Sequence, residues 1–436
     1  MSETRFYKET NFQHTEIGEL PQEWQVRELC DIVMKDRNAI KRGPWGGSIK
    51  KEIFVKSGYK VYEQKNVIHN DFSIGTYFIT EGKFDELKDF AIKEGDILLT
   101  AAGTIGKTTI VPTNFQPGII NQALIKISLD QNIMLRSYFK FLFDHVDFQI
   151  KILSSSHGAT MKNFSSVSVL KSINLPTPSV AEQEKIISVI STIDQTIKRT
   201  DGIIAETQEL KKGLMQRLLT RGIGHSEFKK TEIGEMPEEW EVVRLRDVAK
   251  IRSGKSRLRG NIKNVAFVPM ELIPEEGITA NFVMKEVGEV SSCTYCEVDD
   301  ILLAKITPSL ENGKQALVPN TVPEGFALAT TEVFPLVCEG IDTMFLFYLL
   351  RFPRFRKILE NSMRASTQRL RVPKDALLNL MIPRPRFSDE QKRIVSILLG
   401  ADEEIENEKR TKEYLVKTKK WFMDNLLTGK IRIRMN

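Results

Sequence analysis

The segment TEIGELPQEWQVRELCDI at residues 15–32 decides the organisation of this chain, because a close copy, TEIGEMPEEWEVVRLRDV, occupies residues 231–248. Later landmarks recur in the same order. EGDILL matches VDDILL, INLPTPSVAEQEKI matches LMIPRPRFSDEQKRI, and GLMQRLLT matches WFMDNLLT. Two copies that each fill about half of the chain indicate a duplication and not a solenoid of short repeats. The 436 residues are enough for two or more domains and a sizeable core.

The two copies agree at their beginnings and ends but hardly match in their middles, roughly residues 40–160 and 250–365. The middles contain short β-branched and aliphatic runs, such as GIINQALIKISL, that are typical of strands. Short helices are expected within residues 134–153 and 342–359. The predicted fold is mixed α+β, with two tandem domains, residues 1–178 and 222–387, related by pseudo-two-fold symmetry.

Each copy is expected to end in one long helix, over residues 179–221 and 388–436. Ser179 and Ser388 are predicted N-caps, because Glu182 and Gln391 follow three residues later. Apolar residues then recur every three or four positions, as at Ile186, Ile190, Ile193 and Ile197. We expect the two helices to pack on each other as an antiparallel coiled coil that separates the domains. The alternative is that each helix packs along its own domain.

The stretch DILLTAAGTIGKTTI at residues 96–110 superficially resembles a phosphate-binding loop, which requires Gly-x-x-x-x-Gly-Lys-Ser/Thr followed by a helix. Ala101 stands where the first glycine is needed, and TIVPTNFQPG after Lys107 predicts a strand and a turn instead of a helix. We therefore predict a turn between two strands and no nucleotide site.

Composition is that of an ordinary soluble protein. No apolar run is long enough to cross a membrane, and the polar first residues do not resemble a secretory signal. Four cysteines in a chain of this length favour a reducing, cytoplasmic location. The single pair Cys293 and Cys296 has neither a second pair nor a nearby histidine, so we expect no zinc site.

Basic residues gather in the divergent middles, although the formal net charge is only +6. The basic segments are residues 41–51, which include Trp45, and residues 250–263 and 351–374. Clusters of this kind are often solvated faces, but they are also the electrostatic signature of a nucleic-acid binder.

Taken together, the motifs resemble the specificity subunit of a type I restriction-modification system. The resemblance rests on the IGE-x-P-x-x-W motif near residues 16–24 and 232–240, the DILL landmark, and the Ser366-Thr367-Gln368 element. It also rests on the P-x-P…EQ-K-I passage into a long helix that ends LLTG, and it covers essentially the whole chain. The first copy departs from the pattern, because GATMKNF at residues 158–164 stands where the STQ element is usual.

The resemblance implies two target-recognition domains that each read half of a bipartite double-stranded DNA site. The repeated helices would set the spacing and dock two methylation subunits, which bind S-adenosylmethionine; restriction subunits would add ATP- and Mg-dependent translocation and cleavage. This chain itself would be non-catalytic and without a cofactor. Consistent with that, it has no Pro-Pro and so no Asn/Asp-Pro-Pro-aromatic methyltransferase motif. The alternatives are a coiled-coil scaffold without a DNA role and a standalone DNA-acting enzyme.

Arg and Lys suit phosphates and guanine edges, whereas Asn and Gln suit adenine edges. From the basic and STQ-like segments we predict DNA contacts by Lys41, Arg42, Trp45, Ser48, Lys107, Lys162 and Asn163 in the first copy. In the second copy we predict contacts by Arg252, Lys255, Arg257, Arg259, Gln368, Arg369 and Arg371.

Overall fold

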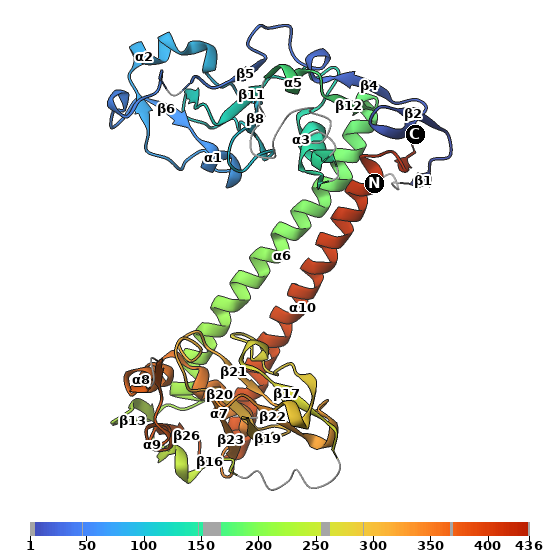
Figure 1. The fold of residues 1–436 in the computed structure, drawn as a ribbon. Helices are drawn as coiled ribbons and strands as arrows, with labels where there is room; N and C mark the ends of the chain where they lie inside the picture. Colours follow the sequence, from blue (N-terminus) through green and yellow to red (C-terminus); the bar gives the residue numbers. More distant parts are fainter. Residues whose placement is uncertain are drawn as a thin grey trace. The chain divides into compact units, whose positions relative to one another are not determined.

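The computed structural model describes residues 5–45, 47–146, 148–150, 167–253, 262–290, 292–366 and 369–434. The chain divides into two compact units (Figure 1). Unit 1 comprises Met1–Arg199 with Thr411–Asn436, and unit 2 comprises Thr200–Arg410. The predicted mixed helix-and-sheet fold with two tandem units is confirmed.

Unit 1 is built around a four-stranded antiparallel sheet in the order β5-β11-β8-β9. Its strands are β5 (Ile40–Arg42), β8 (Ile97–Thr100), β9 (Thr108–Ile110) and β11 (Leu124–Ile127). All side chains of β8 and β11 are buried, so these strands form the interior. A second sheet contains β6 (Tyr59–Tyr62), β7 (Phe78–Ile79) and β10 (Gly118–Ile120), with β6 and β10 parallel. Short helices described in this unit include α1 (Gln64–Ile68), α2 (Glu81–Glu86) and α5 (Val167–Lys171).

Unit 2 repeats this plan although its sequence barely matches. Its central sheet has the order β16-β23-β20-β21, with β16 (Ala249–Ile251), β20 (Ile301–Ala304), β21 (Gln315–Leu317) and β23 (Val333–Cys338). The second sheet has the order β18-β17-β22-β19, with β17 (Asn264–Val268), β18 (Val283–Glu286), β19 (Thr294–Glu297) and β22 (Phe326–Ala329). The pair β17–β22 is parallel, as β6–β10 is in unit 1. The pattern of buried strands therefore preserves the fold while the side chains change.

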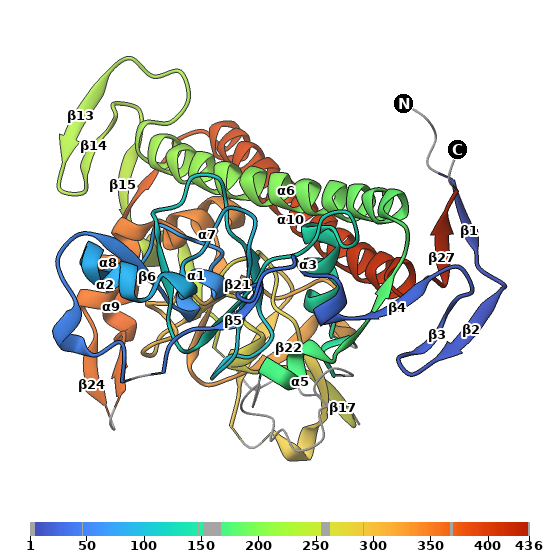
Figure 2. The same cartoon turned by 90° about the horizontal axis from the view of Figure 1, so that it is seen from above.

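The matching ends of the two copies form matching strand pairs. In unit 1, β2 (Phe12–Thr15) pairs with β3 (Gly18–Pro21), and β4 (Gln25–Glu28) pairs with β12 (Asn174–Thr177). In unit 2, β13 (Phe228–Thr231) pairs with β14 (Gly234–Pro237), and β15 (Glu241–Arg244) pairs with β26 (Met381–Arg384). Unit 1 has one further pair, in which β1 (Phe6–Lys8) runs antiparallel to β27 (Ile431–Ile433), beside the two chain ends (Figure 2).

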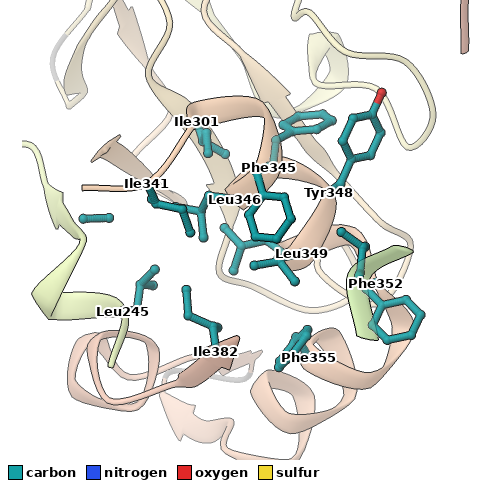
Figure 3. Close-up of a cluster of buried hydrophobic side chains, with 14 of the residues drawn as sticks. Leu245, Ile301, Ile341, Phe345, Leu346, Tyr348, Leu349, Phe352, Phe355 and Ile382 are labelled. Atoms are coloured by element: carbon teal, nitrogen blue, oxygen red, sulfur yellow. The ribbon is translucent and has the colours of Figure 1, made fainter. Parts of the chain in front are cut away.

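The main apolar core of unit 2 surrounds α7 (Thr343–Arg351), which α8 (Pro353–Asn361) follows. Phe345, Leu346 and Leu349 of α7 are fully buried in the cluster drawn in Figure 3. Each such side chain contributes about 1.5–3 kcal/mol through burial. The corresponding helix of unit 1 is α3 (Arg136–Asp144), with Tyr138, Phe139, Phe141, Leu142 and Phe143 buried. These helices confirm the short helices expected there. Unit 2 also contains α9 (Lys374–Leu378) and the hairpin of β24 (Arg364–Ser366) and β25 (Arg369–Arg371).

The two long helices are α6 (Val180–Arg221) and α10 (Ser388–Leu426), and each unit contains half of each. In unit 1, the first half of α6 lies antiparallel to the last half of α10, with Asp194 Oδ1 2.6 Å from Lys419 Nζ. In unit 2, Lys211 Nζ lies 2.5 Å from Asp402 Oδ1. Within each unit the predicted antiparallel pairing is confirmed.

The predicted N-cap at Ser179 is confirmed, because its hydroxyl accepts a hydrogen bond from the Glu182 amide at 3.3 Å. Ser388 is instead the first residue of α10, so the cap predicted there is wrong by one position. The second copy has one more residue than the first between its Pro-marked segment and the helical Gln391.

Candidate nucleic-acid interface

The loops of unit 1 that carry the predicted contacts meet at one end of its strands. The Gly43 amide donates to the Leu124 carbonyl at 3.0 Å, and the Ala101 amide donates to the Ala123 carbonyl at 2.8 Å. Asn121 in turn donates to the Tyr62 carbonyl at 3.0 Å. The ends of β5, β6, β8 and β10 and the start of β11 are thus joined, and we call this region the strand-end surface of unit 1.

Trp45 is the most prominent side chain of this surface, with 78% of its area exposed. It follows Gly43 and Pro44, which are both buried. A Cβ at Gly43 would overlap the Asn121 carbonyl oxygen, so only glycine allows this approach. The loop therefore has a fixed base and an exposed tip.

Arg42 and Ser48, two further predicted DNA contacts, lie near this tryptophan. The Arg42 guanidinium lies 5.5 Å from the Trp45 ring centroid, and its Nε donates to the Gln122 carbonyl at 3.0 Å. Ser48 is exposed, and its amide closes a turn on the Trp45 carbonyl at 2.9 Å. Lys41 is less available, because its Nζ lies 3.5 Å from Asp89 Oδ2.

Lys107 is exposed at the end of the turn between β8 and β9. Its amide donates to Thr100 Oγ1 at 2.9 Å, and its carbonyl accepts from the Thr100 amide at 2.9 Å. The two strands form an antiparallel hairpin with no helix after the lysine. The prediction of a sheet turn in place of a phosphate-binding loop is confirmed. Lys162 and Asn163 lie outside the described residues.

In unit 2, the guanidinium of Arg252 is held by two carboxylates. It contacts Asp300 through two bonds of 2.5 and 2.8 Å and Glu297 at 2.9 Å. The hydrogen bond to Asp300 is the main reason that the pKa of Arg252 is raised. Burial nevertheless raises the pKa of Asp300, so desolvation outweighs the guanidinium there. The two-pronged geometry indicates a structural ion pair at the end of β16. The predicted residues Lys255, Arg257 and Arg259 lie outside the described residues.

The β24–β25 hairpin contains two exposed arginines, Arg364 and Arg369, and one that is paired with a carboxylate, Arg371. Arg371 contacts Glu332 through bonds of 3.0 and 2.8 Å, and this pairing lowers the pKa of Glu332. Arg369 is exposed, and the neighbouring Leu370 retains 44% of its area. The Thr307 amide donates to the Leu370 carbonyl at 3.1 Å, which fixes the hairpin beside the end of β20. Gln368 lies outside the described residues.

The duplicated tryptophan and glutamate, which served above only as landmarks of the repeat, form a second constellation. In unit 1, Trp24 Nε1 donates to Glu182 Oε2 at 3.1 Å, and Arg432 Nε donates to Glu182 Oε1 at 2.9 Å. In unit 2, Trp240 Nε1 donates to Glu390 Oε2 at 3.0 Å, and His225 Nε2 lies 2.8 Å from Glu390 Oε1. We call each set a Trp–Glu lock. It joins the start of a copy to the start of its long helix.

The glutamine that follows each lock glutamate also has a structural role. Gln183 Oε1 accepts from the Leu135 amide at 2.8 Å, just before α3. Gln391 Oε1 accepts from the Asp342 amide at 2.8 Å, just before α7. The repeated EQ pair therefore fixes the long helix to the core helix of its unit. A tryptophan and an EQ pair at matching places in both copies were the available sequence signal.

The Cys296 thiol is buried, which raises its pKa, and lies 3.2 Å from the Ala327 carbonyl. Within the described ranges no group of three or more His, Cys, Asp or Glu side chains is arranged to hold a metal ion. Over the same part of the chain, no helix is long and apolar enough to cross a membrane.

Comparison with known proteins gives concordant matches. A family model described as the type I restriction modification DNA specificity domain matches residues 21–209 and 237–416. The MjaVIII specificity subunit of Methanocaldococcus jannaschii, a type I restriction enzyme subunit, is 30% identical over 443 residues, covering 99% of this chain and 98% of that protein. The putative MjaX specificity subunit of the same organism is 30% identical over 450 residues, covering 99% of both.

Two solved structures share the fold. A chain from a study of complex assembly and conformational transition in the type I R-M system has a TM-score of 0.55 at 16% identity, covering 94% of this chain and 99% of its own. The type I S subunit from M. genitalium has a TM-score of 0.51 at 14% identity, covering 95% and 97%.

Proposed function

The chain belongs to the family of type I restriction-modification DNA specificity subunits, and we propose that each of its two units reads one half of a split DNA target. It is the DNA target-recognition subunit of such a system and not a catalytic one. One observation carries the proposal for the two halves. The central sheets of both units have the same strand order, yet the segments that build them, roughly residues 40–160 and 250–365, are where the two copies differ most.

We assign two roles to the predicted contact residues. The side chains Trp45, Ser48, Lys107 and Arg369 are the ones that contact DNA, because they are exposed and so accessible to a ligand. Arg252 and Arg371 are held by carboxylates and position the loops around them. Arg42 is intermediate, since it supports Trp45 while part of its surface remains exposed. Lys162, Asn163, Lys255, Arg257, Arg259 and Gln368 remain predicted contacts.

The partners follow from the family. We propose that two methylation subunits dock along the long helices, residues 179–221 and 388–436, and that restriction subunits join them. Recognition would belong to residues 1–178 and 222–387. S-adenosylmethionine, ATP and Mg would be bound by those partners. The purified chain is expected to bind DNA but neither to cleave it nor to hydrolyse ATP.

The test is to sequence the methylated sites made by the chain together with its methylation subunits. The expected result is two short defined sequences separated by an unread gap. Trp45→Ala combined with Lys107→Ala should weaken discrimination in one half-site and leave the other unchanged. Methylation without sequence preference, or at a single continuous site, would contradict the proposal.

A further inference from the structure

The amide of Gln64 is the feature of the strand-end surface that the predicted contacts leave unexplained. Gln64 begins α1, two residues after β6 ends. Helix α1 packs against β8 and β9, the strands on either side of the Lys107 turn. A Cβ at Gly103 in that turn would lie 3.3 Å from Gln64 Oε1, so the amide lies directly beside the turn.

One hydrogen-bonding group of Gln64 has no partner among the described residues. Its Nε2 is shielded from solvent, yet it has no hydrogen bond to any described residue. A shielded donor of this kind normally costs about 1–3 kcal/mol, and such groups in native structures call for an explanation. Asn66, two residues later, donates to the Asp71 carbonyl at 3.0 Å and to the Ile74 carbonyl at 2.8 Å. The local backbone therefore satisfies one amide and leaves the other unmatched.

The position of Gln64 suits contact with a ligand from outside the chain. The residue as a whole is only half-buried, and Gly103 and Thr104 of the neighbouring turn are exposed. The terminal torsion of a glutamine is soft, so the amide oxygen and nitrogen can exchange places at little cost to suit a ligand beside the turn. Lys107 lies at the end of the same turn, and cations of this kind fix the register of a DNA backbone.

We propose that Gln64 reads an adenine in the half-site bound by unit 1. A glutamine amide presents one donor and one acceptor side by side, which match N7 and the N6 amino group of adenine in the major groove. No other base edge offers that pair in the same geometry. This inference rests on the proposed function, because it assigns a base to a DNA-reading surface.

Unit 2 supplies the control. Its strand β17 corresponds to β6, and Met270 begins the following turn two residues after the strand ends, as Gln64 does in unit 1. Methionine is thus accommodated at this place in the fold but has no amide. Gln64→Met removes the reading group and keeps a side chain of similar length.

The experiment uses the full complex of this chain with its methylation subunits and a library of randomised DNA duplexes. Bound duplexes are sequenced for the unaltered chain, Gln64→Met and Gln64→Glu. For Gln64→Met we expect the preference for adenine to fall about 5- to 150-fold at one position of one half-site. For Gln64→Glu we expect preference at that position to move toward cytosine, whose amino group donates to a carboxylate.

The outcomes separate this inference from the proposed function. If the unaltered complex selects no bipartite sequence, the proposed function itself fails. If it does, but Gln64→Met keeps every base preference, Gln64 does not read DNA. If Gln64→Met weakens base preference equally at all positions of the half-site, with no adenine position affected more than the others, Gln64 has a structural role. That result also overturns the inference.

Discussion

Replacing Arg432 with alanine tests whether the C-terminal segment is a structural part of unit 1. The Arg432 side chain is 9% exposed and is hydrogen-bonded to Glu9, Glu23 and Glu182 at 2.9–3.0 Å. Glu182 and Glu9 are themselves 4% and 9% exposed, whereas Glu23 is 75% exposed. The substitution therefore leaves two buried carboxylates without their cation.

The expected magnitude follows from that geometry. Removing one partner of a buried ion pair costs about 3–5 kcal/mol, because the remaining charge stays desolvated. The exposed partner Glu23 adds at most about 1 kcal/mol. Trp24 still donates to Glu182, which limits the loss. We expect the free energy of unfolding of unit 1 to fall by about 3–5 kcal/mol at pH 7.

The assay is urea unfolding of the full chain with Trp45, Trp240 and Trp421 replaced by phenylalanine, so that the fluorescence of Trp24 reports on unit 1. Lys430→Ala is the matched control, because Lys430 belongs to the same terminal segment but is exposed. The control should change the free energy of unfolding by less than about 0.5 kcal/mol. A loss below about 1 kcal/mol for Arg432→Ala would refute the reasoning.

The pH dependence of the free energy of unfolding provides a second check of the ion pair between Arg432 and Glu9. Backbone hydrogen bonds from Asn11, followed by the bond to Arg432, lower the pKa of Glu9 below its usual value of 4.5. A lowered carboxyl pKa stabilises the folded state above the unfolded value, and this stabilisation is lost as the pH falls through the folded value. The difference between Arg432→Ala and the unaltered chain should therefore shrink below about pH 4.5. A difference that stays constant down to pH 3 would argue against an ion pair.

Three further predictions concern other parts of the chain. Tyr348→Phe removes the 2.7 Å hydrogen bond to Asp402 and should destabilise unit 2 by about 1–3 kcal/mol. The measurement is urea unfolding of a chain in which Trp240 is the only tryptophan left. No change in stability would mean that Lys211 alone satisfies Asp402. Lys107→Ala should reduce the slope of log K against log salt by about one unit for DNA binding by the complex, whereas Lys198→Ala, on the exposed side of α6, should not. Gly43→Ala should abolish the sequence discrimination attributed to unit 1, because the added Cβ overlaps the Asn121 carbonyl. In the control Gly82→Ala, the added Cβ meets no atom within 4 Å, so DNA selection should not change. Equal effects of the two variants on DNA selection would show that the loop base is not rigid.

The sequence predicted those features that depend on local pattern or on the duplication. Ala101 and the β-branched residues after Lys107 were enough to predict a hairpin turn, because both effects act within a few residues. The strand pairs β4–β12 and β15–β26 lie where the matching ends of the copies lie. The long helices followed from their apolar spacing, which is a local property.

Contacts between distant segments were not predictable in the same way. Nothing local to Arg252 shows that Asp300, 48 residues later, holds its guanidinium, and Arg371 is likewise paired with Glu332. Arg252 and Glu332 lie in the divergent middle of the second copy, so the first copy does not identify their partners. From sequence alone, an arginine that is free to contact DNA therefore cannot be distinguished from one that forms an ion pair with a carboxylate of the same chain.

The two Trp–Glu locks explain how recognition can change while the fold is kept. Trp24, Glu182 and their counterparts Trp240 and Glu390 all lie in the matching ends of the copies. The strand-end surface of unit 1 is built from the divergent middle of the first copy, and no residue assigned to DNA contact belongs to a lock. A substitution at Trp45 or Gln64 consequently leaves the attachment of the long helix untouched, whereas a change in a lock weakens a whole unit. The locks are not identical, because Arg432 of the C-terminal segment completes the first, and His225, in the segment between α6 and β13, completes the second. The lock of unit 1 therefore requires Arg432 from the C-terminal segment, whereas all residues of the lock of unit 2 lie within Thr200–Arg410.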